Sequence, residues 1–162
     1  MPYSRQEPEL AWAALRRAED TDFAKSPETA ISKENLEAVF NALMRVPEGF
    51  TPLRKIQKLL DDKVKLYQEN QEMDWATGEL LAYASLLLEG KDVRMSGQDV
   101  ERGTFSHRHA VISNEEGTKR YNRLSKIAEN QGSFRIYNSL LSEYGVLGFE
   151  FGYAMANPNT LV

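Results

Sequence analysis

The residues of this chain that could carry out chemistry gather in two stretches. The first runs from Gly97 to His109 and holds both histidines of the chain, with Arg102 and Arg108 beside them. The second runs from Tyr137 to Gly152 and holds a carboxylate, Glu143, where a predicted strand gives way to a glycine-spaced helix. Titratable side chains, hydrogen-bond donors and glycines that permit close approach are the components of a functional site, so we expect a site where these stretches meet.

His107 and His109 lie two positions apart in a segment, 105–112, whose pattern predicts a strand. In a strand both histidines would project to one face and Arg108 to the other. Such a pair could meet an anion or shuttle protons, because the charge of histidine changes near neutral pH. A metal site would need a third and a fourth ligand, and the chain has no third histidine. An ordinary polar strand is the simplest alternative, just as Arg102 and Arg108 could serve either an anion or structural ion pairs.

Glu143 stands at the entrance to a helix predicted over 143–156. Its simplest role is favourable placement of a carboxylate near the positive end of the helix. Three glycines follow in the same helix, each costing about 1 kcal/mol relative to alanine, which indicates close approach of a neighbouring helix, a second subunit or a cofactor. They are Gly145, Gly148 and Gly152, and their spacing matches neither of the common phosphate-binding loops.

Apolar stripes predict the helices that must position these residues. Ser32 can cap a helix whose apolar side chains recur at helical spacing through Met44. A second helix is expected to begin at Thr51-Pro52, with four lysines on a solvated face. Asp74 caps a third, more apolar helix over 75–88. The apolar residues of the first two stripes are Leu36, Val39, Phe40, Leu43 and Met44, then Leu53, Ile56, Leu59, Leu60, Val64 and Tyr67; the lysines are Lys55, Lys58, Lys63 and Lys65.

Short strands are predicted over 93–95, 105–112 and 134–137, and another opens at Thr160. The segment 118–130 is open to either a loop or a short helix. Because helices and strands alternate, the sequence predicts an α/β fold with a mainly parallel sheet. The polar break over 69–72 divides the chain into a helical connector segment, 1–72, and an α/β part, 73–162.

Composition excludes several classes of protein. The net charge is -4, from 20 Lys+Arg against 24 Asp+Glu, and no basic cluster interleaved with aromatics is present, which argues against nucleic-acid binding. Cysteine is absent, so disulfides, thiolate metal sites and a cysteine nucleophile are excluded. No apolar run approaches the ~20 residues that a membrane span needs. We expect a cytoplasmic protein that contacts no membrane.

The two stretches together carry a family resemblance. They read SGQDVERGTFSHRHAV and FRIYNSLLSEYGVLGFEFGY, and they resemble the thiamine-diphosphate-dependent first component of the 2-oxoglutarate dehydrogenase complex. The similar region covers 74–162. In that family this region begins a transketolase-like pyrimidine-binding domain. Because the chain is far shorter than such an enzyme, the resemblance implies an excised fragment with a truncated, mainly parallel sheet and flanking helices.

The resemblance also implies roles for individual residues. His109 matches a histidine that handles the oxo-acid substrate and its adduct, and His107 precedes it at a position that varies in the family. Glu143 matches the glutamate that hydrogen-bonds a ring nitrogen of the aminopyrimidine of thiamine diphosphate. The full-length enzyme is implied to be a homodimer that binds thiamine diphosphate and magnesium. It would decarboxylate 2-oxoglutarate and pass the acyl group to a lipoyl-bearing acyltransferase component.

Parts of such an enzyme are missing from this sequence. The family's diphosphate and magnesium motif begins G-D-G, which does not occur here. We therefore expect that the chain alone binds no cofactor tightly and turns over no substrate. A relative specific for 2-oxoadipate shares these motifs and is an alternative. A non-catalytic helical interaction module over 32–88 is a second alternative, of a different class.

Overall fold

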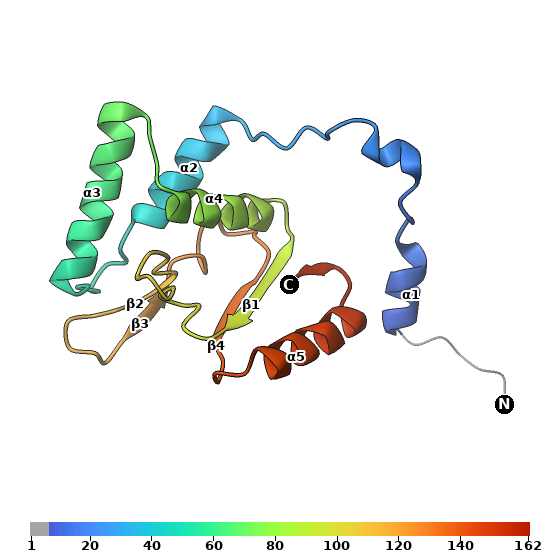
Figure 1. Ribbon diagram of the computed structural model, residues 1–162. Coiled ribbons are helices and arrows are strands. Elements are labelled where there is room, and N and C mark those ends of the chain that lie inside the picture. The colour runs from blue at the N-terminus through green and yellow to red at the C-terminus, as the bar shows by residue number, and fades with distance from the viewer. Residues whose placement is uncertain (1–6) are drawn as a thin grey trace.

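The computed structural model describes residues 7–162 as helices above and below a small sheet (Figure 1). The helices are α1 (Glu7–Ala14), the 3-10 helix η1 (Asp20–Phe23), α2 (Lys33–Met44), α3 (Arg54–Asn70), α4 (Trp75–Leu88) and α5 (Glu143–Ala156). The strands are β1 (Asp92–Gly97), β2 (Val111–Ser113), β3 (Arg120–Asn122), β4 (Phe134–Asn138) and β5 (Thr160–Leu161).

Two of the predicted helix starts are confirmed by their capping hydrogen bonds. The Ser32 hydroxyl accepts from the backbone N–H of Asn35 at 3.1 Å, and the Asp74 carboxylate accepts from that of Thr77 at 2.8 Å. Each bond satisfies a backbone donor that the first helical turn leaves without a partner.

The predicted start of the next helix, at Thr51-Pro52, is wrong. Pro52 instead bridges to Asn114, and the N–H of Leu53 donates to the carbonyl of Ser113 at 3.4 Å. This pairing with a distant segment holds residues 51–53 extended, so α3 begins only at Arg54.

The sheet that contains the first predicted strand is parallel, as expected. Its order is β4-β1-β5, and β1 pairs in parallel with both neighbours, Val93 opposite Phe134 and Asp92 opposite Thr160. The segment that follows β1 forms something the sequence did not indicate, a two-stranded antiparallel pair of β2 and β3. β3 also lies in the segment that was open to loop or helix.

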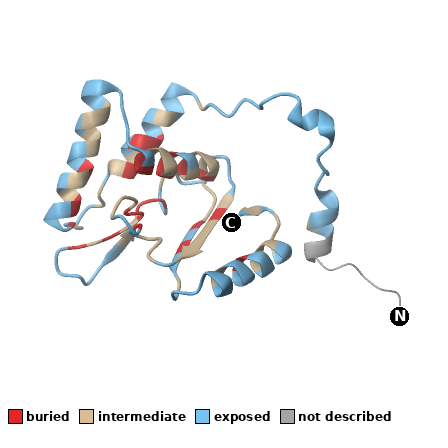
Figure 2. Cartoon of the chain, viewed as in Figure 1, coloured by how far each residue is buried: buried red, intermediate tan, exposed pale blue. Residues whose placement is uncertain are grey.

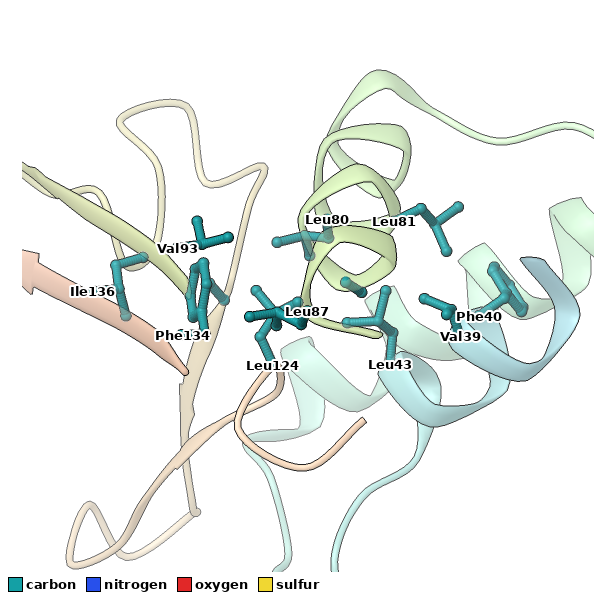
Figure 3. Packing of buried hydrophobic residues seen from close by; sticks show 12 residues of the cluster. Val39, Phe40, Leu43, Leu80, Leu81, Leu87, Val93, Leu124, Phe134 and Ile136 are labelled. Carbon is teal, nitrogen blue, oxygen red and sulfur yellow. The ribbon is translucent and has the colours of Figure 1, made fainter. Parts of the chain in front are cut away.

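The hydrophobic core lies between α2, α4 and one face of the sheet (Figure 3). α2 contributes Val39 and Leu43, and α4 contributes Leu87, all without exposed surface. Full burial of such a side chain stabilises the fold by about 1.5–3 kcal/mol. The core therefore includes residues on both sides of the predicted boundary at 72, and α2 packs on the α/β part.

The two faces of the sheet differ in character because side chains alternate along each strand. Val93, Phe134 and Ile136 enter the core beneath α4. Between them in sequence, Arg94 and Ser96 contact Glu150 of α5. α4 and α5 thus cover opposite faces of the sheet, one apolar and the other polar (Figure 1).

One of the four lysines predicted on the solvated face of α3 is not solvated. Lys55, Lys58 and Lys65 are exposed, as predicted. The side chain of Lys63 is only 10% exposed, and its ammonium lies 2.6 Å from a carboxylate oxygen of Asp74. α3 packs so closely against the start of α4 that this prediction was wrong.

Candidate functional site

The loop 97–109, which holds both histidines, has unusual backbone geometry. The prediction of a strand over 105–112 was wrong, since regular strand begins only at Val111. Three residues other than glycine have positive φ in this loop: Asp99 at 51°, Ser106 at 53° and His109 at 43°. Such left-handed conformations are uncommon for residues other than glycine and persist where the surroundings impose them.

Side chains from three other elements impose this conformation. Asn138, at the end of β4, donates to Glu101 at 2.9 Å and accepts from the Glu101 backbone N–H at 3.1 Å. Arg120 of β3 forms an ion pair with the same Glu101 carboxylate. Arg108 pairs with Glu79 of α4 at 2.8 Å. Arg108 therefore serves a structural ion pair, one of the two roles that the sequence left open.

His109 is buried, with 7% of its surface exposed. Its Nε2 lies 2.9 Å from the carbonyl oxygen of Ser106. A carbonyl can only accept, so Nε2 carries the hydrogen and Nδ1 is the acceptor nitrogen of the neutral ring. Burial lowers the pKa of His109 below its ordinary 6.5, opposed by the bond to Ser106 and reinforced by the positive charges of Arg123 and Arg102. The imidazole is therefore held neutral near pH 7.

Arg123 fixes the backbone of His109, and no pattern in the sequence pointed to it. Its guanidinium is 1% exposed and donates to the carbonyl of Leu43 through Nε at 3.0 Å and Nη2 at 2.9 Å. Nη1 donates to the carbonyl of His109 at 3.3 Å. Desolvation lowers the pKa of Arg123 to about 10, so the side chain is still charged at neutral pH.

His107 does not share a face with His109. A Cβ placed on Gly103, whose φ is +81°, would lie 2.4–2.9 Å from the atoms of the His107 ring, so only glycine leaves room for it. His107 lines a hollow of about 370 Å³ together with Lys55 and Lys63 of α3. Its Nδ1 is buried without a hydrogen-bond partner. The predicted polar pair on one strand face is thus replaced by one buried histidine and one at a basic hollow.

Glu143 is the first residue of α5, and its side chain is exposed. The helix is capped by Ser142, whose hydroxyl accepts from the N–H of Gly145 at 3.3 Å. Glu143 lines a hollow of about 270 Å³ together with Gly97 and Gln98, which end β1 and begin the loop. In open parallel sheets, ligands bind outside the carboxyl ends of the strands, and this hollow lies there.

The structure therefore brings together the two stretches, but not all of their proposed site residues. Glu143 meets the start of the loop, whereas His107 lines a separate hollow and His109 lines neither. Within residues 7–162, no group of three histidine, cysteine, aspartate or glutamate side chains could hold a metal ion. Arg123 and the buried Glu150 were not identified from the sequence. Apolar and polar residues alternate in VRMS, before the loop, and this pattern could have indicated a polar partner for Glu150.

Comparison with known proteins identifies the family. Residues 71–162 match the model of the transketolase pyrimidine-binding domain. The chain belongs to this family. The family accounts for the parallel sheet with flanking helices, and the resemblance that the two stretches carry is confirmed.

Three of the relatives found for this pyrimidine-binding domain share one description. These three are the 2-oxoglutarate dehydrogenase E1 components of Brucella anthropi, Brucella ovis and Brucella canis, each 43% identical to this chain over 152 residues. The match covers 94% of the chain and 15% of each relative. The chain thus spans only a small part of the length of the proteins it resembles. Within the described residues, no helix is both long and apolar enough to cross a membrane.

Proposed function

We propose that this chain is part of an enzyme that oxidatively decarboxylates 2-oxoglutarate and passes the acyl group to a lipoyl group on an acyltransferase component. The observation that carries the proposal is the hollow at the carboxyl end of β1, where Glu143 and the start of the 97–109 loop meet. The similarity to 2-oxoglutarate dehydrogenase E1 components supports the choice of substrate.

The residues at this hollow fit one side of thiamine diphosphate. The carboxylate of Glu143 is exposed and would hold a proton at a ring nitrogen of the aminopyrimidine. Because the sequence contains no G-D-G, we propose that residues outside it hold the diphosphate and the magnesium ion. When bound, the cofactor supplies the carbanion chemistry, and the protein orients and tunes it.

We propose that His109 contacts the oxo-acid substrate. Its Nε2–H is committed to the Ser106 carbonyl, so the neutral ring presents Nδ1 as an acceptor. Left-handed backbone at His109, imposed by contacts with Arg123, supports a functional rather than a purely structural position. His107 contributes at the neighbouring hollow, where the exposed Lys55 and Lys58 would attract the carboxylates of a dicarboxylic acid.

We propose a homodimer in the cytoplasm, with a second subunit covering the outer surface of α5. Leu147 and Phe151 are each 70% exposed there, and Tyr144 is 95% exposed. Apart from the neighbouring residues and backbone of α5 itself, no atom of the described residues lies within 4 Å of a Cβ placed on Gly148 or Gly152. The two glycines therefore leave room for close approach by another chain. A large exposed apolar patch usually marks such a protein–protein contact.

The test is made on a longer protein that contains this chain, supplied with thiamine diphosphate and magnesium. Reduction of an artificial electron acceptor is followed with 2-oxoglutarate, 2-oxoadipate and pyruvate. We expect activity with 2-oxoglutarate and a loss of about a hundredfold or more in kcat for Glu143→Gln. Preference for 2-oxoadipate would reassign the substrate within the same class.

Glu34→Gln is the matched control, because Glu34 is also an exposed glutamate in the first turn of a helix. It should leave kcat unchanged. Equal activity of Glu143→Gln and wild type would move the activating carboxylate elsewhere. No turnover of any of the three acids would favour the helical interaction module instead. For the chain alone, tight magnesium-dependent binding of thiamine diphosphate would contradict the proposed division of the cofactor site.

A further inference from the structure

The helix that carries Glu143 is held in an unusual way. Of the residues of α5, only Glu150 is buried, and the helix is almost wholly exposed on its outer side (Figure 2). Several of its large apolar side chains, among them Leu147 and Phe151, are exposed to solvent. Most surface helices bury an apolar stripe against their sheet. In α5 the buried side chain is a carboxylate.

This carboxylate meets a charged partner on the sheet. The Nε of Arg94, in β1, lies 2.8 and 3.0 Å from the two oxygens of Glu150. The hydroxyl of Ser96 donates to Glu150 at 2.5 Å. The side chains of Arg94 and Glu150 are 11% and 10% exposed. Burial raises the pKa of Glu150, but the hydrogen bonds from Arg94 and Ser96 lower it overall, so the carboxylate is ionised.

Aromatic rings enclose the guanidinium from both elements. Its central carbon lies 4.8 Å from the ring centre of Tyr137 on β4, and 5.2 and 4.6 Å from those of Phe149 and Tyr153 on α5. Cations are attracted to the faces of such rings, most strongly when water is excluded. Arg94 thus contacts the helix through a carboxylate and two aromatic rings.

Little else supports the N-terminal half of α5. A hollow of about 430 Å³ lies between β1 and the first turns of the helix, lined by Arg94, Ser96, Gly145 and Val146. Among the described residues, the other side-chain hydrogen bonds that join α5 to distant segments are near its C-terminal end, where Arg135 donates to Tyr153 at 3.0 Å and Trp12 donates to the carbonyl of Met155 at 2.7 Å. The end that carries Glu143 therefore depends on Arg94 and Glu150.

We propose that Arg94 and Glu150 are positioning residues, whose pairing rather than apolar packing fixes α5 on the sheet and so sets the place of Glu143. The consequence for catalysis rests on the proposed function, but the placement of the helix does not. Removing one partner would leave a buried charge unpaired, which is much less favourable than keeping or removing both.

The first test measures the position of the helix in the chain itself. Because the chain has no cysteine, spin labels can be attached at Ala82→Cys on α4 and Tyr144→Cys beside Glu143, both exposed positions. Glu150→Gln retains an oxygen that accepts from Arg94 and Ser96, whereas Glu150→Leu retains the volume alone. We expect a narrow distance distribution for wild type and Glu150→Gln, and a broad one for Glu150→Leu.

Hydrogen exchange measures how much the helix is loosened when the pair is broken. Amides of α5 should exchange about a hundredfold faster in Glu150→Leu, while those of α4 change little, because only the helix is released. Glu79→Leu, which breaks the Arg108 pair on the other face of the sheet, is the control and should leave α5 unaffected. A distribution as narrow in Glu150→Leu as in wild type, or equal loosening by Glu79→Leu, would overturn the proposal. Neither measurement needs turnover, so the proposed placement of α5 is tested separately from the activity of Glu143→Gln.

Discussion

Arg123 offers the sharpest test of how this fold is held together. Its guanidinium is buried at 1% exposure between the end of α2 and the 97–109 loop. Its oxygen partners within residues 7–162 are backbone carbonyls, those of Leu43 and His109, so no carboxylate of this part of the chain neutralises the charge. Replacing Arg123 with methionine removes the charge and the hydrogen bonds together. Replacing it with lysine keeps the charge but not the planar group that reaches both carbonyls.

The free energies predict that Arg123→Met is more stable than Arg123→Lys, although lysine resembles arginine more closely than methionine does. Each unit of pKa corresponds to about 1.4 kcal/mol. Desolvation lowers the pKa of Arg123 from the ordinary value of arginine to about 10, which puts the cost of burying the charge at about 3 kcal/mol. Two buried carbonyls left without donors cost about 1–3 kcal/mol each. Arg123→Met recovers the desolvation cost of about 3 kcal/mol and loses about 2–6 kcal/mol at the two carbonyls, so the net change lies between about 1 kcal/mol gained and about 3 kcal/mol lost.

Arg123→Lys recovers none of the desolvation cost, because lysine keeps the charge. The ammonium is more strongly hydrated than a guanidinium and can satisfy fewer of the carbonyls, so we expect a greater loss than for Arg123→Met, by up to about 3 kcal/mol. Urea unfolding followed by circular dichroism measures both losses. Arg120→Lys is the control, because Arg120 is 59% exposed in its pair with Glu101 and should cost about 1 kcal/mol or less. A lysine variant more stable than the methionine variant would refute the reasoning.

Three further predictions concern the site and its supports. Burial raises the pKa of Asp74, but hydrogen bonds from Lys63 and the first turn of α4 lower it overall, so the stabilisation by Asp74 is lost as the pH falls below 3.8. Asp74→Ala should therefore cost about 1 kcal/mol at pH 7 in urea unfolding and should weaken this pH dependence. Gly103→Ala should displace the His107 ring, visible as shifted ring resonances in NMR spectra, and destabilise the fold by about 1–2 kcal/mol, since φ is +81° there. Burial is the main cause that lowers the pKa of His109, so its NMR titration midpoint should lie below 6.5. The free energy of unfolding should therefore fall as the pH drops through 6.5 in wild type but not in His109→Gln. A midpoint at or above 6.5 would contradict the buried, neutral ring.

The sequence by itself determined the features that depend on local pattern. Ser32 and Asp74 cap helices because a hydroxyl or carboxylate at that position can reach the N–H groups of the next turn, whatever the rest of the chain does. The helix over 143–156 followed from its local pattern, and the parallel sheet followed from the alternation of helices with strands. The two stretches that carry the family resemblance placed Glu143 at a helix entrance. The division at residue 72 stays a prediction, as do the roles of Glu143, His107 and His109.

Only the tertiary structure decided the conformation of the 97–109 loop and the means by which α5 is held. Residues 105–112 have a strand pattern, yet the backbone at Ser106 and His109 is left-handed because partners 14–37 positions away hold the loop. Arg123 lies 14 positions from His109, and Asn138 lies 37 positions from Glu101. Arg94 and Glu150 meet across 56 positions. Local patterns report which face of an element is apolar, but a buried charge is tolerated only where a distant partner arrives with matching geometry, and that arrival is a property of the folded chain.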